Sequence, residues 1–366
     1  MRLRLFVGFV VLAAVATLIA RERGLIWGQP PRTVIVHGLA NPRGLALARD
    51  GTLFVAEAGT GGHDRVVGEP DKRRYHVGLT GRVSRISPNG ERSTFADGFV
   101  SAFTNHDDDI GPTGVAIVGD ELFVLTAAGG WSWGDKSADN AIWRLDPSGN
   151  RARVFDYQRY CTEEPSLARR QDPRADVPGG MPFGMAARGA TLFTTDGNHE
   201  FVMALEPGGT PHRVVEFPRS DQAMTGVTAG LDGRIYFTTL GGWPYLQGTG
   251  NVWRLSENGE AEVVWSGLTT PIGVAVDTDG TIYAAEFTAP LKQWPDTGRV
   301  LRRSPEGRVD EVATRLNFPT ALALSREGAL FVTNNGHLAS DGSGEIIRLD
   351  VRPHPLSSWL AHLRGD

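Results

Sequence analysis

The sequence has little cysteine and charge, and it lacks the fingerprints of several common enzyme classes. Its single cysteine, Cys161, excludes a disulfide within the chain. A Gly-x-Ser-x-Gly elbow, a Walker loop and a dinucleotide-binding glycine motif are all absent, so chemistry that needs an activated serine or a nucleotide has no support. No histidine and cysteine have zinc-site spacing. With a net charge of −5 and no basic run, nucleic acid is not an expected partner.

The first 27 residues have the features of an export segment. Met1-Arg2-Leu3-Arg4 is a charged head, Leu5 to Ala20 is apolar, and Ala14-Val15-Ala16 offers a small-x-small cleavage site. A cleaved signal peptide and an uncleaved membrane anchor both fit, since the apolar run is shorter than the roughly 20 residues of a spanning helix. In either case we expect an extracytoplasmic domain, periplasmic or secreted.

What the sequence has in abundance is glycine and proline, with 46 and 22 residues, which suits short strands joined by turns. An inner strand from Pro42 runs to an Asp50-Gly51 turn, and a second strand, Thr52 to Ala56, follows. Third and fourth strands, Gly81 to Ile86 and Glu91 to Phe95, complete the unit. Four antiparallel strands in succession are typical of a propeller blade.

Degraded copies of the inner-strand opening recur to the end of the chain. They are Asn41-Pro42-Arg43-Gly44, Gly111-Pro112-Thr113-Gly114, Met181-Pro182-Phe183-Gly184, Ala223-Met224-Thr225-Gly226, Thr270-Pro271-Ile272-Gly273 and Phe318-Pro319-Thr320-Ala321. The copies predict an all-β fold, a six-bladed β-propeller of four-stranded antiparallel blades over residues 28–353. Thr33 to His37 is a lone strand that would complete the last blade and latch the ring. Residues 354–366 form a tail that could contain a short helix.

Four insertions lengthen the first blades: His63 to Thr80, Val100 to Ile110, Ala128 to Asn140 and Gln158 to Gly180. All fall in connections between second and third strands or between blades, which emerge on one face of a propeller. We call this the long-loop face. Binding residues concentrate on loops carried by a rigid scaffold, so this face is the expected functional one.

The residues that end the second strands are mostly polar. They are Glu57, Thr126, Asp196, Thr239, Glu286 and Asn334. Together with Asp107 of the His106-Asp107-Asp108-Asp109 loop, Glu57, Asp196, Glu286 and Asn334 are candidate ligands of Ca²⁺ or another divalent cation. The alternative is that each side chain accepts backbone N–H bonds from its own turn, and that the acidic loop is solvated. His199, beside the proposed ring, is the candidate general base.

Aromatic side chains stand on two glycine-rich loops of the expected functional face. Trp131 and Trp133 follow Gly129-Gly130, and Trp243 and Tyr245 follow Gly241-Gly242. With His106, these residues are candidates for binding a flat or amphipathic small molecule. They could equally cover the ends of blades.

The sequence resembles the ScyD/ScyE family of exported propellers, and more distantly the NHL-repeat and streptogramin-lyase-like propellers. The resemblance rests on Asn41 to Ala46, Val55 to Gly62, Thr80 to Ile86, Phe331 to Gly336 and Gly344 to Ile346. It implies a six-bladed ring, export and an accessory part in small-molecule metabolism. Gluconolactonase-like and strictosidine-synthase-like propellers share the architecture.

Three functions fit these features. The leading hypothesis is a propeller that binds a small molecule on the long-loop face, with a divalent cation as its potential cofactor. The second is a metal-dependent hydrolase, lactonase or lyase in which the cation polarises a carbonyl and His199 moves a proton. The third is a non-catalytic scaffold with a protein partner.

Overall fold

The computed structural model describes residues 30–63, 65–68, 74–104, 109–127, 140–171, 179–219, 221–241, 245–256, 258–289, 296–337 and 342–352. The predicted signal or anchor segment and the predicted tail helix lie outside these residues. Within them, no helix combines the length and apolar character needed to cross a membrane.

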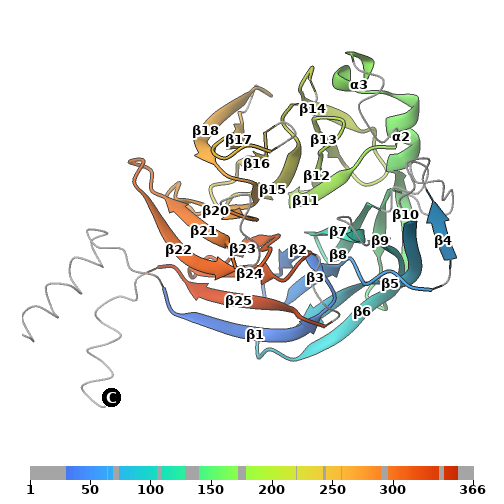
Figure 1. Cartoon of the computed structure of the whole chain (residues 1–366), viewed down its shortest axis with the longest axis horizontal. Helices are drawn as coiled ribbons and strands as arrows, with labels where there is room; N and C mark the ends of the chain where they lie inside the picture. Colours follow the sequence, from blue (N-terminus) through green and yellow to red (C-terminus); the bar gives the residue numbers. More distant parts are fainter. Residues whose placement is uncertain are drawn as a thin grey trace, which may run out of the picture.

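The strands form antiparallel sheets that stand side by side around a common centre (Figure 1). Three sheets follow the chain order: β11 (Pro182–Arg188), β12 (Thr191–Asp196), β13 (Phe201–Leu205) and β14 (His212–Glu216); β15 (Met224–Ala229), β16 (Ile235–Thr239), β17 (Gly250–Leu255) and β18 (Ala261–Leu268); β19 (Pro271–Val276), β20 (Ile282–Glu286), β21 (Gly298–Arg303) and β22 (Val309–Leu316). The prediction of four-stranded antiparallel blades is confirmed for these sheets.

The two ends of the propeller meet in a fourth four-stranded sheet. Its strand order is β1 (Arg32–Leu39), β25 (Gly344–Asp350), β24 (Ala329–Asn334) and β23 (Leu322–Leu324). Thr33 of β1 lies opposite Arg348 of β25, and Val34 lies opposite Ile347. The predicted latch, in which an N-terminal strand completes the last blade, is therefore confirmed.

The prediction of six separate four-stranded sheets is not met, because the first two repeats form one nine-stranded sheet. Its path is β10 (Arg151–Asp156), β9 (Ala141–Leu145), β8 (Glu121–Ala127), β7 (Asp109–Val118), β6 (Arg92–Thr104), β5 (Arg74–Ile86), β3 (Leu53–Glu57) and β2 (Pro42–Leu47), with β4 (Arg65–Gly68) paired to β5. Strands β5 and β6 run for 13 residues each. Their added length brings β6 against β7, where Phe103 pairs with Asp109 and Ala102 with Ile110.

Three of the four predicted insertions contain regular structure, and Val100 to Ile110 includes the end of β6 and the start of β7. The first, His63 to Thr80, supplies β4 and the first half of β5. The last, Gln158 to Gly180, contains α2 (Tyr157–Glu163) and α3 (Leu167–Gln171). Asp156 caps α2 by accepting a hydrogen bond from the Arg159 backbone N–H, as expected for an N-cap carboxylate.

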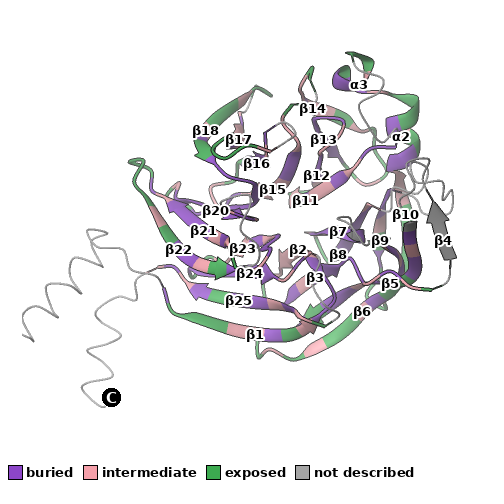
Figure 2. Ribbon diagram, in the orientation of Figure 1, coloured by how far each residue is buried: buried purple, intermediate pink, exposed green. Residues whose placement is uncertain are grey.

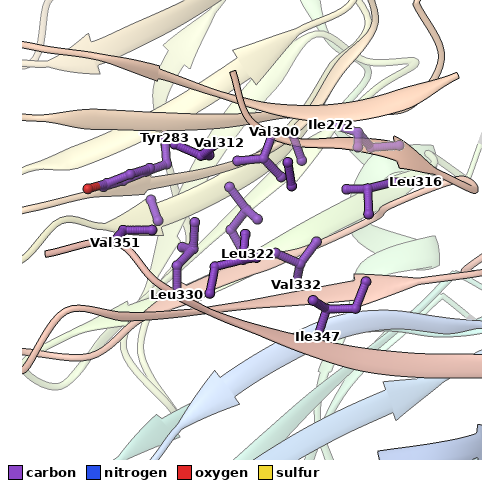
Figure 3. Packing of buried hydrophobic residues seen from close by; sticks show 14 residues of the cluster. Ile272, Tyr283, Val300, Val312, Leu316, Leu322, Leu330, Val332, Ile347 and Val351 are labelled. Carbon is purple, nitrogen blue, oxygen red and sulfur yellow. The ribbon is translucent and has the colours of Figure 1, made fainter. Parts of the chain in front are cut away.

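Apolar side chains between neighbouring sheets form the core. Figure 2 colours the buried residues of the strands purple. Figure 3 shows one such layer, in which Val300 and Leu316 face Val332 and Ile347 of the latched sheet. The inner ends of the sheets approach even more closely. A methyl group added to Gly44 would lie 2.7 Å from the Thr113 carbonyl oxygen, and one added to Gly226 would lie 2.5 Å from that of Ile272. This crowding explains the recurring glycine of the Pro-x-Gly openings.

Candidate functional site

The inner strands of all six repeats line one narrow cavity at the centre. These strands are β2, β7, β11, β15, β19 and β23, and the cavity volume is about 40 Å³. Hydroxyl groups tie neighbouring strands together: Thr320 donates to the Pro42 carbonyl oxygen at 2.6 Å, and Thr225 donates to that of Pro271 at 2.9 Å. Small-molecule pockets usually measure about 300 to 1,000 Å³. The central cavity is therefore too small to enclose a small molecule.

On the long-loop face, the mouth of the central channel carries a guanidinium group, an imidazole and two phenyl rings. The Arg43 Nη2 atom lies 3.0 Å from Nδ1 of His337. A guanidinium group only donates, so Nδ1 accepts and the imidazole proton is on Nε2. The His337 ring lies 5.5 Å from Phe287 and 5.9 Å from Phe318, whose centroids are 4.8 Å apart. The cluster of Arg43, His337, Phe287 and Phe318, which we call the mouth cluster, combines polar donors with aromatic walls.

Three separate elements bring the mouth cluster together. Arg43 is the second residue of β2, Phe287 follows β20, and Phe318 and His337 lie on either side of the β23 and β24 hairpin. The sequence analysis assigned no functional role to His337 or to Arg43. One signal was present: the position between proline and glycine is charged in the first opening and uncharged in the others.

Hydrogen-bond donors of the protein itself contact the residues that end the second strands. Glu57 is fully buried and accepts hydrogen bonds from the Ala40 backbone N–H at 2.6 Å, from Ser84, and from Arg82 and Arg92 at 3.0 and 3.1 Å. Hydrogen bonds from charged donors are the strong ones. Glu57 therefore ties its turn to the third and fourth strands of its blade.

The other ring positions also accept hydrogen bonds from groups of the protein. Glu286 accepts from Thr269 N–H at 2.6 Å and from Arg299 at 2.5 Å, Asp196 accepts from Met181 N–H at 2.9 Å, and Asn334 accepts from Asn317 N–H at 2.8 Å. Thr126 and Thr239 accept the indole N–H groups of Trp143 and Trp253, each at 3.1 Å. Glu57, Glu286, Asp196 and Asn334 thus accept a backbone N–H from a segment just before an inner strand, whereas Thr126 and Thr239 accept from indole rings.

The structure offers little support for a cation at these positions. In the part of the chain that it describes, no group of three or more histidine, cysteine, aspartate or glutamate side chains is placed to hold a metal ion. Asp107, the remaining candidate ligand, lies outside the described residues. Because the carboxylates of Glu57 and Glu286 already have arginine partners, their charges need no cation for neutralisation.

His199 does not reach the mouth cluster. Its side chain is fully buried, and its ring stands edge-on to Phe201 with centroids 6.1 Å apart. Its backbone N–H donates to Asp196 Oδ1 at 2.7 Å. A general base must come within hydrogen-bond reach of its substrate. The His199 side chain is thus not exposed at the surface in this structure, and its role as general base stays a prediction.

The predicted aromatic site falls largely outside the described residues. Trp131, Trp133, Trp243 and His106 cannot be placed, and only Tyr245 is described, half-buried between β16 and β17. The aromatic mouth predicted from these loops stays a prediction. The aromatic walls that the structure does describe come from Phe287 and Phe318 instead.

Two side chains of α2, Tyr157 and Cys161, are buried close to Asp196. A methyl group added to Gly180 would lie 2.5 Å from Asp196 Oδ2 and 2.8 Å from the Cys161 sulfur, so these atoms share one small space. Burial, followed by the charge of Asp196, raises the pKa of the Cys161 thiol and that of Tyr157 well above their ordinary values. Both groups are neutral at physiological pH. Cys161 is therefore an unreactive thiol and not a nucleophile.

Comparisons with known proteins place the fold among the β-propellers. No protein-family model matches the sequence, and no curated protein matches it. An oxidoreductase described as a glucose dehydrogenase from Thermus thermophilus is 17% identical, with a TM-score of 0.59 over 87% of this chain and 99% of that one. The PQQ-bound aldose sugar dehydrogenase of Streptomyces coelicolor is 14% identical, with a TM-score of 0.52 over 88% and 99%.

A third solved structure is an inactive variant of virginiamycin B lyase from Staphylococcus aureus with quinupristin. It is 12% identical, with a TM-score of 0.50 over 87% of this chain and 98% of that one. At such identities the likeness concerns the fold alone. The predicted resemblance is confirmed at the level of the β-propeller, and membership of the ScyD/ScyE family stays a prediction.

Proposed function

We propose that this protein is an extracytoplasmic, six-bladed β-propeller that binds a small molecule at the mouth of its central channel, on the long-loop face. The observation that carries the proposal is the contact of Arg43 with His337 beside Phe287 and Phe318. Donor groups next to aromatic rings suit a molecule with acceptor oxygens and a flat apolar part. The export segment at residues 1–27 supports the extracytoplasmic location.

The six-blade count in this proposal treats the nine-stranded sheet as two blades. Its path contains two runs of four strands, β2-β3-β5-β6 and β7-β8-β9-β10, joined through only two residue pairs between β6 and β7. Each run contributes one inner strand to the central cavity, as every other sheet does. In this proposal the carboxylates of Glu57, Asp196 and Glu286 accept hydrogen bonds from backbone N–H groups of the turns.

A thermal-shift screen of lactones, esters and sugar derivatives tests the proposal, because a bound ligand raises the melting temperature by mass action. A compound that stabilises the protein should bind Arg43→Ala and His337→Ala at least about tenfold more weakly, the usual value of a charged hydrogen bond. Arg49→Ala is the matched control, since Arg49 is exposed at the other end of the same hairpin. Equal binding to all three variants would refute the proposal.

A further inference from the structure

A second hollow lies on the face opposite the channel mouth, between the β11 to β14 sheet and the β15 to β18 sheet. Its volume is about 520 Å³, within the usual range for small-molecule sites. Its walls include the β11–β12 turn, the turn at Gly233 and the turn at Gly259. These turns lie at the far ends of the strands from Pro182 and Met224, where the long-loop face begins. We call this opposite side the hairpin face.

The floor of the hollow is apolar. Phe193 is 2% exposed, and it packs in one cluster with Ala204, Leu255 and the partly buried Val214. All four side chains line the hollow. A ligand resting on this floor would remove its own apolar surface from water, which favours binding by about 25 cal/mol for each Å² removed.

The rim carries one guanidinium group that is not neutralised. Arg234 pairs with Asp232 at 3.3 Å, and Asp232 also accepts from the Tyr236 hydroxyl at 2.7 Å. Arg188 is exposed, and its guanidinium carbon lies 5.2 Å from the centroid of the Phe193 ring. Across the residues that the structure describes, Arg188 makes no ion pair. The charge of Arg188 therefore remains available directly above an aromatic floor.

A hollow at the same place between the first and second repeats has the opposite character. Its volume is about 270 Å³, and its rim carries Arg85 against four carboxylates, those of Asp50, Asp120, Glu121 and Asp146. A gap between two blades is thus a feature of the architecture and carries no function by itself. Compared with the hollow between the first and second repeats, the hollow at Arg188 is larger and has a positive rim.

We propose that the hollow at Arg188 is a second binding site, which takes a monocarboxylate with an aromatic or short aliphatic body. The carboxylate accepts hydrogen bonds from Arg188 at the rim, while the apolar body fills the space beside Ala204, Val214 and Leu255. This site is separate from the mouth cluster and faces the other way. The protein would therefore bind two chemically different small molecules on its two faces.

Isothermal titration with 2-naphthoate as the probe, and with the uncharged 2-naphthamide as its comparison, tests the second site. Naphthoate should bind measurably and the amide at least about tenfold more weakly, because a charge-assisted hydrogen bond is lost. Arg188→Ala should weaken naphthoate binding by a similar factor, and Ala204→Leu should weaken it by filling the hollow. Arg85→Ala, in the matched hollow, should leave binding unchanged.

Two outcomes would overturn the proposal. One is a failure of the expected binding pattern: the unaltered protein does not bind naphthoate, or folded Arg188→Ala and Ala204→Leu bind it equally well. Melting curves check that both variants are folded. The other is that Arg43→Ala abolishes binding while Arg188→Ala does not. That second outcome would place the probe at the channel mouth, so the second site would fail while the proposed function stood.

Discussion

Glu57 and Glu200 serve the same kind of turn in different parts of the molecule, with contrasting surroundings. Each accepts a hydrogen bond from the backbone just before an inner strand, where Asn41 in one case and Ala223 in the other has a positive φ. Glu57 comes from its own blade and has two arginine partners. Glu200 comes from the preceding sheet, is 1% exposed, and has no charged partner within the described residues.

The different surroundings give the two carboxyl groups different charges. Glu200 Oε1 accepts from the Ala223 and Gln222 N–H groups at 2.9 and 3.3 Å, while Oε2 has no hydrogen-bond partner in the described part of the chain. Burial raises the pKa of Glu200 to about 8, against the opposing effect of those two hydrogen bonds. The same turn is thus closed by an ion-paired carboxylate in one place and by a neutral acid in another.

Replacing Glu57 should have the largest effect. Glu57→Ala removes the acceptor for Ala40 N–H and leaves Arg82 and Arg92 without their buried partner, which typically costs about 3 to 5 kcal/mol. Urea unfolding measures the loss. Glu121→Ala is the control, because the exposed pair of Glu121 with Arg144 should contribute at most about 1 kcal/mol. If Glu57→Ala lost no more stability than Glu121→Ala, the turn at Glu57 would not depend on a buried, ion-paired carboxylate.

Glu200 should make stability depend on pH in the direction opposite to a paired carboxylate. Because its pKa of about 8 in the folded protein lies above its ordinary value of 4.5, the folded state retains a proton that the unfolded chain releases. The contribution is fully present below about pH 4.5 and is lost as pH rises toward 8, by about 1.4 kcal/mol per pH unit.

Glu200→Gln tests this dependence, because glutamine imitates the protonated acid. The free energy of unfolding, measured at pH 5, 6.5 and 8, should fall less steeply in the variant, which should be the more stable protein at pH 8. Glu206→Gln, on an exposed turn of the same sheet, should keep the original slope. Parallel slopes for Glu200→Gln and the unaltered protein would show that Glu200 is charged when folded.

Asn334 is an uncharged member of the set of residues that end the second strands, and its replacement should have a smaller effect. Its side chain accepts from Asn317 N–H at 2.8 Å and donates to Glu345 at 2.9 Å. Asn334→Ala should cost about 1 to 2 kcal/mol of stability in thermal or urea unfolding. Asn334→Asp should also destabilise, since it sets a carboxylate against Glu345. Greater stability for the aspartate variant would mean that this turn prefers a charge, as the Glu57 turn does.

The smallest expected effect concerns backbone strain. Ala223 has φ of +48°, a conformation that costs an L-residue roughly 1 to 2 kcal/mol. Ala223→Gly should therefore stabilise the protein by about 0.5 kcal/mol, after the greater freedom of glycine in the unfolded chain is subtracted. Ala284→Gly, in the buried strand β20, should destabilise instead. A loss of stability in both variants would show that the turn is not strained.

Much of the fold could be predicted from local signals. The Asp50-Gly51 turn and the strand after it appear as expected, with β3 at Leu53–Glu57, and the lone N-terminal strand appears as β1 at Arg32–Leu39. The long β5 and β6 and the helices of the last insertion were missed. Whether a strand extends depends on the partner that it pairs with across the sheet, and tertiary context overrides local propensity there.

The candidate site was much less predictable. Sequence reasoning identified Glu57, Asp196, Glu286 and Asn334 as equivalent positions, and each does end its second strand. Their hydrogen-bond partners depend on distant segments, so the choice between a cation site and a turn acceptor stayed open. The contact of Arg43 with His337 joins residues 294 positions apart, and no local pattern connects them.

The sequence by itself determined the repeat. Glycine suits hairpin turns with positive φ, such as the one at Gly51. A strand needs apolar side chains for its buried face, and an inner strand needs a small residue where it touches the next, and these signals lie within a few residues of each other. Only the tertiary structure decided which charges meet. Closing the ring buries Glu57 with two arginines and Glu200 with none, and it brings Arg43 to His337, because these contacts depend on how whole sheets pack and not on neighbours in the chain.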